Sequence, residues 1–452
     1  MTQQFMTGNI FTTLGGKASR TKNVISVFAV TLLAVLVSLI LAPKAHATTY
    51  DVTLSSSCTL PQALEAAATD AIVGTCAAGD GDDTINVGAG AYNLSAALGA
   101  IVVPGNISII GENAVSTIID GGGFGGVTIG AAGNYLLENL TFQNFTSSPT
   151  GETLLVNVAG NVTANKLIVK DNACVTPAAF LPVCAIALTA GTEDITTTIS
   201  NSAFYNNSAL FLFANARPPG SLVKLGTSFM NIFNNTIYDN NSGIINVYNG
   251  ADADGTAVAN VYNNTIVNNT ASETVPFMFA VNLGDGFSAE LNLRNNILSG
   301  NKLFDDTTAA NCYSYGGSNS TITSDGGNIS SDGTCIALFT GTNDQNSTDP
   351  LLAAYQQVGS TFVMPLQAGS PALENAVTGA PATPGFDQRG VTRPQSAIAD
   401  SGAYEYVAAV PTPTPSPGNL APTGWDTRLP VLLATLFVLA GLTGVGYAVK
   451  KN

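Results

Sequence analysis

Short apolar segments recur along the middle of the chain, and each is followed at once by asparagine-rich polar residues. Their Val, Ile, Thr and Phe content and their short length predict β-strands that end in turns. Six segments share this signature, at 140–144, 167–172, 202–207, 235–240, 264–269 and 296–301. The steps between their central apolar residues, from Phe142 to Leu298, are 27, 35, 33, 29 and 32 residues. This spacing lies within the window of about 20–50 residues that is typical of solenoid repeats.

Strands of this length cannot bury their apolar faces alone, so they must stack on neighbouring repeats. Helix-forming patterns are nearly absent from this region, which favours an all-β solenoid over helical repeats. The asparagines have two structural interpretations that the sequence leaves open. They can occupy left-handed turn positions, or they can form a ladder of amide hydrogen bonds from coil to coil. The unequal steps predict loops of different length, where binding usually lies.

The N-terminal segment has the pattern of a secretory signal peptide. A basic region precedes the apolar stretch 24–41, and Ala45 and Ala47 supply the small residues that a signal peptidase requires. We therefore predict cleavage after Ala47. The alternative is an uncleaved anchor helix, because the apolar stretch is nearly long enough to span a bilayer.

The C-terminal segment predicts a membrane span. Residues 429–449 carry no charge and have about the 20-residue length that a transmembrane helix requires. The basic tail 450–452 that follows is expected to stay in the cytoplasm. Before the span, the Pro/Thr-rich linker 408–419 is expected to be an extended, stiff spacer.

Between linker and span stands the pentapeptide Leu420, Ala421, Pro422, Thr423, Gly424. The order of spacer, motif, span and basic tail resembles the LPxTG sorting signal of sortase substrates, here in its LAxTG form. The resemblance implies that a sortase cleaves between Thr423 and Gly424 and transfers the chain to a cell-wall amine, so that sortase and peptidoglycan are expected partners. The alternative is a plain transmembrane anchor. Both place the region between the targeting segments on the extracellular cell surface after Sec export.

Composition excludes several functions for the exported part. The sole histidine, His46, lies inside the predicted signal peptide, so the mature chain would have no His-dependent acyl-transfer, acid–base or metal site. Acidic residues outnumber basic ones by 30 to 15, for a formal charge of −15. Nucleic-acid binding is excluded because it requires basic grooves.

Six cysteines fall into local pairs, Cys58 with Cys76, Cys174 with Cys184, and Cys312 with Cys335. An even number in an exported chain predicts disulfides. The sequence leaves the pairing open, because six cysteines allow fifteen connectivities. Zinc is the competing interpretation, but no Cys-x-x-Cys spacing supports it.

The strand repeats resemble the right-handed parallel β-helix of pectate-lyase-like proteins. Residues 58–67, with 79–85, are similar to the CSLREA-type opening of such proteins, although Pro61 and Gln62 replace the usual Arg-Glu. The resemblance implies a short amphipathic helix that caps the first coil, because a solenoid must hide its open end.

The C-terminal part is similar to the choice-of-anchor type Q β-helix family. The similarity rests on 349–352, 369–373, 387–390 and 402–405. Within these, Arg389 is expected to be a buried residue that ties the last strand to the coils. The predicted organisation is a signal peptide (1–47), a cap (48–100), a parallel β-helix (101–345), the choice-of-anchor Q region (346–407), the linker, the motif (420–424), the span and the tail.

Three acidic clusters are candidates for polysaccharide chemistry, Asp82 with Asp83, Asp252 with Asp254, and Asp305 with Asp306. Hydrolases need paired carboxylates, and lyases need carboxylates that bind calcium together with a basic residue. A basic residue able to hold an acidic sugar does not flank any of the clusters, and Arg217 and Arg294 do not pair with them in sequence. We therefore assign no catalytic residue, no metal ligand and no cofactor.

Structural calcium is left open at Asp252 and Asp254 or at Asp80 and Asp82. The favoured interpretation is a non-enzymatic surface scaffold, an adhesin that binds a glycan or another cell surface. The alternative is a surface-attached polysaccharide lyase or glycoside hydrolase.

Overall fold

The chain divides into two compact units, Met1–Tyr406 and Val407–Asn452, and the fold concerns the first. The computed structural model describes residues 47–93, 101–103, 105–123, 127–129, 132–147, 155–157, 160–174, 185–189, 194–208, 211–215, 227–241, 245–248, 256–271, 279–281, 289–312, 314–316, 320–379 and 382–408.

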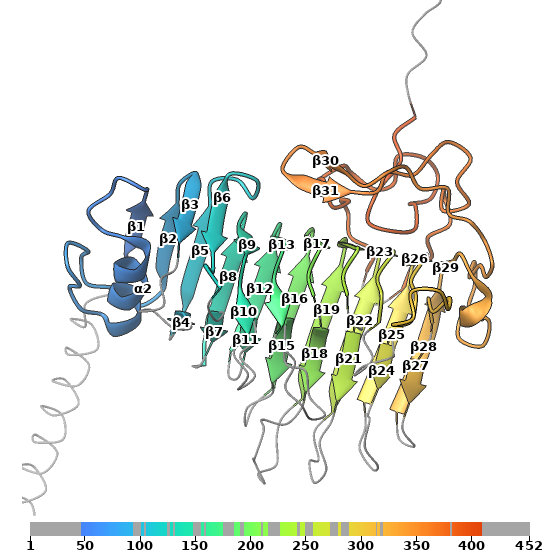
Figure 1. Ribbon diagram of the computed structural model, residues 1–452, viewed down its shortest axis with the longest axis horizontal. Coiled ribbons are helices and arrows are strands. Elements are labelled where there is room, and N and C mark those ends of the chain that lie inside the picture. Colours follow the sequence, from blue (N-terminus) through green and yellow to red (C-terminus); the bar gives the residue numbers. More distant parts are fainter. Residues whose placement is uncertain are drawn as a thin grey trace, which may run out of the picture. The chain divides into compact units, whose positions relative to one another are not determined.

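Three parallel sheets make up the described part of this unit (Figure 1). Sheet 1 contains β1 (Thr49–Val52), β2 (Asp83–Val87), β5 (Ile107–Gly111), β8 (Asn134–Glu138), β12 (Asn161–Asn165), β16 (Ile195–Ser200), β19 (Ser228–Phe233), β22 (Ala257–Tyr262), β25 (Ala289–Arg294) and β28 (Ser320–Gly326). Sheet 2 contains β3 (Gly90–Asn93), β6 (Thr117–Asp120), β9 (Thr141–Gln143), β13 (Ile168–Lys170), β17 (Ala203–Tyr205), β20 (Thr236–Tyr238), β23 (Thr265–Val267), β26 (Ile297–Ser299) and β29 (Ile329–Ser330). Sheet 3 contains β4 (Ile101–Val103), β7 (Val127–Ile129), β11 (Leu155–Asn157), β15 (Ala185–Thr189), β18 (Phe211–Asn215), β21 (Ile245–Tyr248), β24 (Phe279–Val281) and β27 (Ser314–Gly316).

The chain passes through sheets 1, 2 and 3 in turn, from β2, β3 and β4 to β25, β26 and β27. Each passage is one coil, and every strand pairs in parallel with its counterpart in the next coil. This is an all-β, parallel β-helix of the right-handed type, which confirms the solenoid predicted from the repeats. The smaller elements are α2 (Leu60–Thr69), the 3₁₀ turn η1 (Gly333–Cys335), the parallel pair β10 (Thr146–Ser147) and β14 (Ala173–Cys174), and the antiparallel pair β30 (Gln356–Val358) and β31 (Thr361–Val363).

The core consists of stacks of apolar side chains, because alternate residues of a strand face the inside and equivalent residues of successive coils lie in register. In sheet 2, Phe142 is followed by Val169, Phe204, Ile237, Ile266 and Leu298, which are the repeat residues identified in the sequence. All six are at most 5 % exposed. Each repeat therefore stacks its apolar residues on those of the coils above and below it, as the sequence predicts.

Adjacent asparagines at each corner of a coil have different roles. The first residue of each corner pair is left-handed, as at Asn234 and Asn263 between sheets 1 and 2 and at Asp239 and Asn268 after sheet 2. The second residue points inward and bonds its equivalent in the next coil. Both interpretations of the asparagines are therefore confirmed, at neighbouring positions.

Two buried amide ladders run along the corners. The first-corner ladder lies between sheets 1 and 2 and comprises Asn235, Asn264, Asn296 and Asn328, with Nδ2–Oδ1 distances of 3.0–3.1 Å. The second-corner ladder follows sheet 2 and comprises Asn172, Asn207, Asn240, Asn269, Asn301 and Asn311, with distances of 2.8–2.9 Å. Because buried amides that bond on every side are costly to disrupt, the ladders fix the height and register of the coils.

Helix α2 closes the N-terminal end of the solenoid, beside β1 and β2 (Figure 1). Its apolar side chains Leu60, Ala63 and Leu64 are buried in the core cluster. At its first turn, the Thr59 amide donates to Gln62 Oε1 at 3.2 Å. The predicted amphipathic cap is therefore present.

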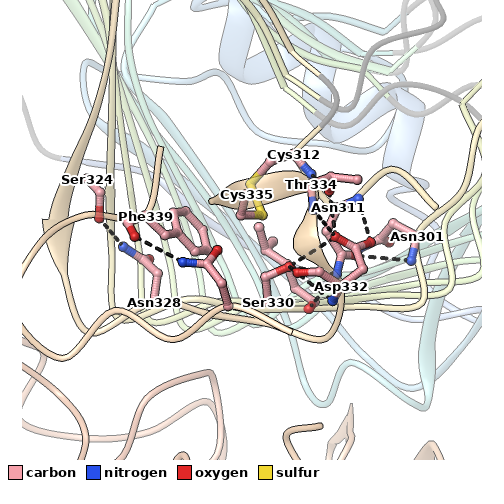
Figure 2. Close-up of a disulfide and its surroundings, with 12 residues drawn as sticks. Asn301, Asn311, Cys312, Ser324, Asn328, Ser330, Asp332, Thr334, Cys335 and Phe339 are labelled. Carbon is pink, nitrogen blue, oxygen red and sulfur yellow. Dashed lines mark hydrogen bonds between the residues drawn. A yellow bond between two sulfur atoms is a disulfide. The ribbon is translucent and has the colours of Figure 1, made fainter. Parts of the chain in front are cut away.

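Two of the three predicted disulfides are present, Cys58–Cys76 and Cys312–Cys335. The third stays a prediction, because Cys184 lies outside the described residues. Figure 2 shows the Cys312–Cys335 bond beside the end of the second-corner ladder, where Asn301 bonds Asn311. The disulfide thus holds the ladder's last amide, which comes from a loop, against the turn at η1.

The predicted targeting segments fall almost wholly outside the described residues. The apolar stretches 24–41 and 429–449, the linker from 409 and the motif 420–424 lie outside the described residues. In the part that is described, no helix is both long and apolar enough to cross a membrane.

Candidate functional site

Two of the three acidic clusters predicted from the sequence lie within the described residues, and these two are at different ends of the solenoid. Asp83 begins β2 and is 1 % exposed, with its side chain directed inward, whereas Asp82 is exposed and accepts a hydrogen bond from Asn106 at 2.6 Å. Asp83 is therefore a strand residue, and Asp82 lies in the bend before the strand. Asp252 and Asp254 lie outside the described residues.

Asp305 organises a tight loop. Its Oδ1 accepts hydrogen bonds from the amides of Thr307 (2.9 Å) and Thr308 (2.8 Å), and its Oδ2 accepts from the Thr308 hydroxyl. These bonds, the Thr308 hydroxyl first, lower the pKa of Asp305 to about 2. Asp305 therefore has a structural role in closing this loop.

Asp306, its neighbour, lines a pocket of about 460 Å³ at the second corner of the coils. We call this the corner pocket, and it is lined by Asp239, Asn240, Asn241, Asn268, Thr270, Gly300, Lys302, Phe304 and Asp306. These residues follow strands β20, β23 and β26 of three successive coils. The pocket lies directly outside the second-corner ladder, because Asn240 belongs to both.

The repeat geometry supplies one wall of the corner pocket. Asp239 and Asn268 are the left-handed first residues of their corner pairs, with φ of 52° and 56°, and both are exposed. Gly300 takes the same position in the next coil with φ of 65°. A Cβ on Gly300 would lie 2.3 Å from Asn268 Oδ1, so the missing side chain leaves room for the Asn268 amide.

The loop held by Asp305 supplies the other wall. Lys302 pairs with Ala309 in an antiparallel bridge, and the Leu303 amide donates to Thr308 O at 2.9 Å. Lys302 Nζ lies 3.1 Å from Asp306 Oδ1. The loop leaves the Phe304 side chain 49 % exposed at the pocket. An aromatic side chain and several hydrogen-bonding groups thus line the same pocket.

This combination suits a hydroxyl-rich ligand. Carboxylates accept hydrogen bonds, amides do both, the ammonium of Lys302 donates, and the Phe304 ring offers an apolar face. The lining is mostly polar, and Phe304 is the one aromatic side chain among the lining residues. Two carboxylates against one ammonium that is already paired disfavour an anionic ligand.

Arg294 lies at the end of β25, on the outer side of sheet 1. Its guanidinium lies 5.5 Å from the centre of the Tyr262 ring, and Tyr262 stacks on Phe233 at 5.0 Å. Burial lowers the pKa of Arg294 and raises that of Tyr262 to about 12. This column packs aromatic rings across coils. Arg217 lies outside the described residues.

The C-terminal region lies over the later coils of sheet 2 (Figure 1, orange). Tyr355 stacks on Tyr238 at 4.5 Å and meets Tyr205 edge-on at 5.3 Å. Burial raises the pKa of Tyr355 far above its ordinary value. Thr236 Oγ1 donates to Gln388 Oε1 at 2.6 Å. The region therefore covers these later coils of sheet 2.

Arg389 acts within the C-terminal region and does not reach the coils through the bonds seen here. Its Nε and Nη2 donate to Asp387 Oδ2 at 2.8 and 2.6 Å, and Nη2 also donates to Glu405 O. Its guanidinium stacks on the Tyr404 ring at 3.5 Å. The ties to the coils come instead from Gln388 and from Ala403, whose amide donates to Thr265 Oγ1 at 2.9 Å. The motifs at 387–390 and 402–405 thus bind each other.

A metal site is not assembled in the described ranges, where no three His, Cys, Asp or Glu side chains form a group able to hold an ion. The suggestion of calcium at Asp252 and Asp254 lies outside those ranges and stays a prediction.

Comparisons with known proteins do not identify a family. No protein-family model and no curated protein match the chain. One solved structure, described as the crystal structure of pectate lyase Pel9A, is 13 % identical and covers 80 % of this chain and 97 % of its own. Its TM-score of 0.23 is too low to support an argument about activity. The fold assignment rests on the sheet topology.

Sequence reasoning found Asp306 but missed the rest of the corner pocket. Asp239 and Asn268 belong to the repeat segments 235–240 and 264–269. The repeat pattern alone does not show that the first residue of each corner pair faces outward. Phe304 belongs to no repeat. A signal was present, because a loop of exposed residues around an aromatic side chain directly follows the last repeat.

Proposed function

We propose that this protein is displayed on the outside of the cell and binds a neutral glycan in the corner pocket without altering it chemically. The observation that carries the proposal is the pocket itself, where the exposed Phe304 ring stands beside the carboxylates of Asp239 and Asp306. Its walls are fixed by the amide ladder and the Asp305 loop, so binding would require little ordering.

Binding can be tested on a glycan array that contains neutral and acidic oligosaccharides. We expect neutral sugars to be retained. For the best of them, Phe304→Ala should weaken binding about tenfold, which corresponds to about 1.4 kcal/mol. The matched control is Phe386→Ala, because Phe386 is also exposed (58 %) but lies in the C-terminal region. Equal affinities for both variants would reject the corner pocket, and an array without any bound sugar would reject glycan binding.

Display at the surface is supported by the two targeting segments and by the resemblance of 420–424 to a sortase signal. A wall-attached protein is released by a peptidoglycan hydrolase and stays with the wall in detergent. We expect this behaviour, and we expect Thr423→Ala to convert the protein into a form that detergent extracts. If detergent extracts the unaltered protein as well, the anchor is the transmembrane helix alone.

A surface-attached polysaccharide lyase or glycoside hydrolase is the second candidate. It is favoured by one observation, that two carboxylates and Lys302 line the same pocket. Incubation with neutral and uronate-rich polysaccharides would then yield reducing ends or unsaturated products, and Asp239→Asn would abolish them. Under the proposed binding function neither product forms.

A further inference from the structure

Asp83 is a buried carboxylate whose hydrogen bonding is incomplete. Its Oδ1 accepts from the amides of Thr48 at 2.8 Å and Asp80 at 3.2 Å. Its Oδ2 is buried and has no hydrogen-bond partner. An unpaired carboxylate oxygen in such a place is costly and calls for an explanation. Gly79 connects this carboxylate to the helix that caps the solenoid. The Gly79 amide donates to Ala66 O of α2, and a Cβ built on Gly79 would lie only 2.4 Å from Asp83 Oδ2.

The surrounding sequence supplies no cation for this carboxylate. From Thr48 to Asn165 the chain contains no Lys, Arg or His, although it contains several acidic residues. Buried carboxylates are normally paired with a cation or a metal. A counter-ion for this carboxylate would come from a distant part of the chain, from solution, or from a group that the intact sequence does not contain.

Thr48 is held to the N-terminal cap by three hydrogen bonds. Its amide donates to Asp83, its hydroxyl donates to Ala78 O at 3.2 Å, and its carbonyl accepts from the Thr84 amide at 2.9 Å. Ala47, directly before it, is exposed. The predicted signal-peptidase site lies between these two residues. The nitrogen that contacts Asp83 is thus the nitrogen that cleavage would release.

We propose that removal of the signal peptide creates an α-ammonium group on Thr48 that forms a buried ion pair with Asp83 and so locks the N-terminal cap. Hydrolysis adds one water across the Ala47–Thr48 peptide bond, so that Ala47 leaves with a carboxylate and Thr48 keeps a protonated amine. The amide offers one N–H, whereas the ammonium offers three. One keeps the bond to Oδ1, and a second is available to Oδ2.

This inference rests on the proposed export, because it requires cleavage after Ala47. It implies that the precursor has a weaker cap than the mature protein. Removal of the signal peptide therefore strengthens a cap that is already formed in the intact chain. Because the cap residues of α2 belong to the main core cluster, the pair acts on the stability of the first coils.

A double-mutant cycle on purified protein with a defined N-terminus tests the pair without depending on export. The N-terminus is either free Thr48 or acetylated Thr48, and residue 83 is either unchanged or altered by Asp83→Asn. Acetylation removes the charge but keeps one N–H, so it isolates the ion pair. We expect acetylation to shift the unfolding equilibrium of the unaltered chain at least about tenfold and to have little effect in Asp83→Asn. Additive effects would overturn the proposal.

Asp82→Asn is the matched control, because Asp82 is adjacent but exposed and bonds Asn106. We expect acetylation to destabilise it as much as the unaltered chain. If Asp83→Asn does not fold, the reactivity of the Thr48 amine in the unaltered protein tests the ion pair instead. In the folded unaltered protein, the Thr48 amine should react with an acylating reagent at least about tenfold more slowly than in the unfolded chain, whereas equal rates would overturn the pair.

N-terminal sequencing of protein recovered from cells tests the cleavage separately. A chain that begins at Thr48 supports the maturation step, and any other N-terminus overturns it. A positive cycle with a different N-terminus would show that the site binds an ammonium but that export does not supply it. Neither experiment involves the corner pocket, so each outcome is independent of glycan binding.

Discussion

The amide ladders predict a large difference between two asparagines of the same coil. Asn264 belongs to the first-corner ladder and is fully buried. Its Oδ1 accepts from both nitrogens of Asn235 at 3.0 Å, and its Nδ2 donates to Ile232 O at 2.9 Å and to Asn296 Oδ1 at 3.1 Å. Asn260 belongs to the same coil but is only partly buried, on the outer face of sheet 1, where it bonds its neighbours at 3.0 and 3.1 Å.

The magnitude follows from which groups lose their partners. In Asn264→Ala, the buried Asn235 amide N–H has no other acceptor among the bonds seen here, which costs about 1–3 kcal/mol. Each of the other ladder bonds that the substitution removes contributes about 1 kcal/mol. Asn235 Nδ2 loses one of these bonds but keeps a partner, because it still donates to Ile199 O at 3.0 Å. We expect a total loss of about 4 kcal/mol in the free energy of unfolding. Asn260→Ala should cost less than about 1 kcal/mol, since solvent replaces its bonds.

Guanidinium denaturation of the two variants measures this difference, and hydrogen exchange at the Asn235 amide reports it locally. We expect exchange at that amide to accelerate in Asn264→Ala and to stay unchanged in Asn260→Ala. If both variants lose the same stability, or if Asn264→Ala costs less than about 1 kcal/mol, the buried ladder does not hold the coils together and the reasoning is refuted.

Three further predictions concern the elements around the ladders and the C-terminal region. Removing the Cys312–Cys335 disulfide, which closes a loop with a sequence separation of 23, should cost about 3 kcal/mol, and denaturation midpoints with and without reductant measure it. Because the folded pKa of Asp305 is lowered to about 2, its contribution to loop stability is complete above the ordinary Asp pKa and is lost as pH falls through about 2. An NMR titration should show this, with Thr308→Val raising the value, and a midpoint near 4 in the unaltered protein would contradict it. Arg389→Lys should destabilise the C-terminal region by about 2 kcal/mol, because lysine cannot replace the paired guanidinium bonds, and limited proteolysis of that region should then accelerate.

The sequence was sufficient to predict the solenoid because each strand repeats the same relation between apolar and polar positions. The stack from Phe142 to Leu298 is visible in the sequence as a spacing. The helix at the N-terminus and two of the disulfides are local features and were also predictable. The contacts between segments far apart in the sequence were not predictable, because a single sequence does not show which loop packs on which coil. Gln388 on Thr236 is such a contact, with a separation of 152 residues.

The corner pocket could be predicted only in part for a related physical reason. A left-handed corner residue and an inward ladder residue can both be asparagine. Asn268 and Asn269 therefore look alike in the sequence, although the Asn268 side chain points outward and the Asn269 side chain points inward to the ladder. Phe304 enters the pocket because Asp305 closes a loop, and that closure depends on hydroxyl and amide donors at 307 and 308. Sequence spacing predicts repeats and does not predict such irregular loops.

A structure of the protein in complex with a neutral oligosaccharide retained by the array would test the central claim most directly. We predict an intact sugar ring against Phe304, with its hydroxyl groups bonded to Asp239 and Asp306. A sugar bound on the outer face of sheet 1 beside Phe233 and Tyr262, or a cleaved product in the pocket, would contradict the proposed binding function.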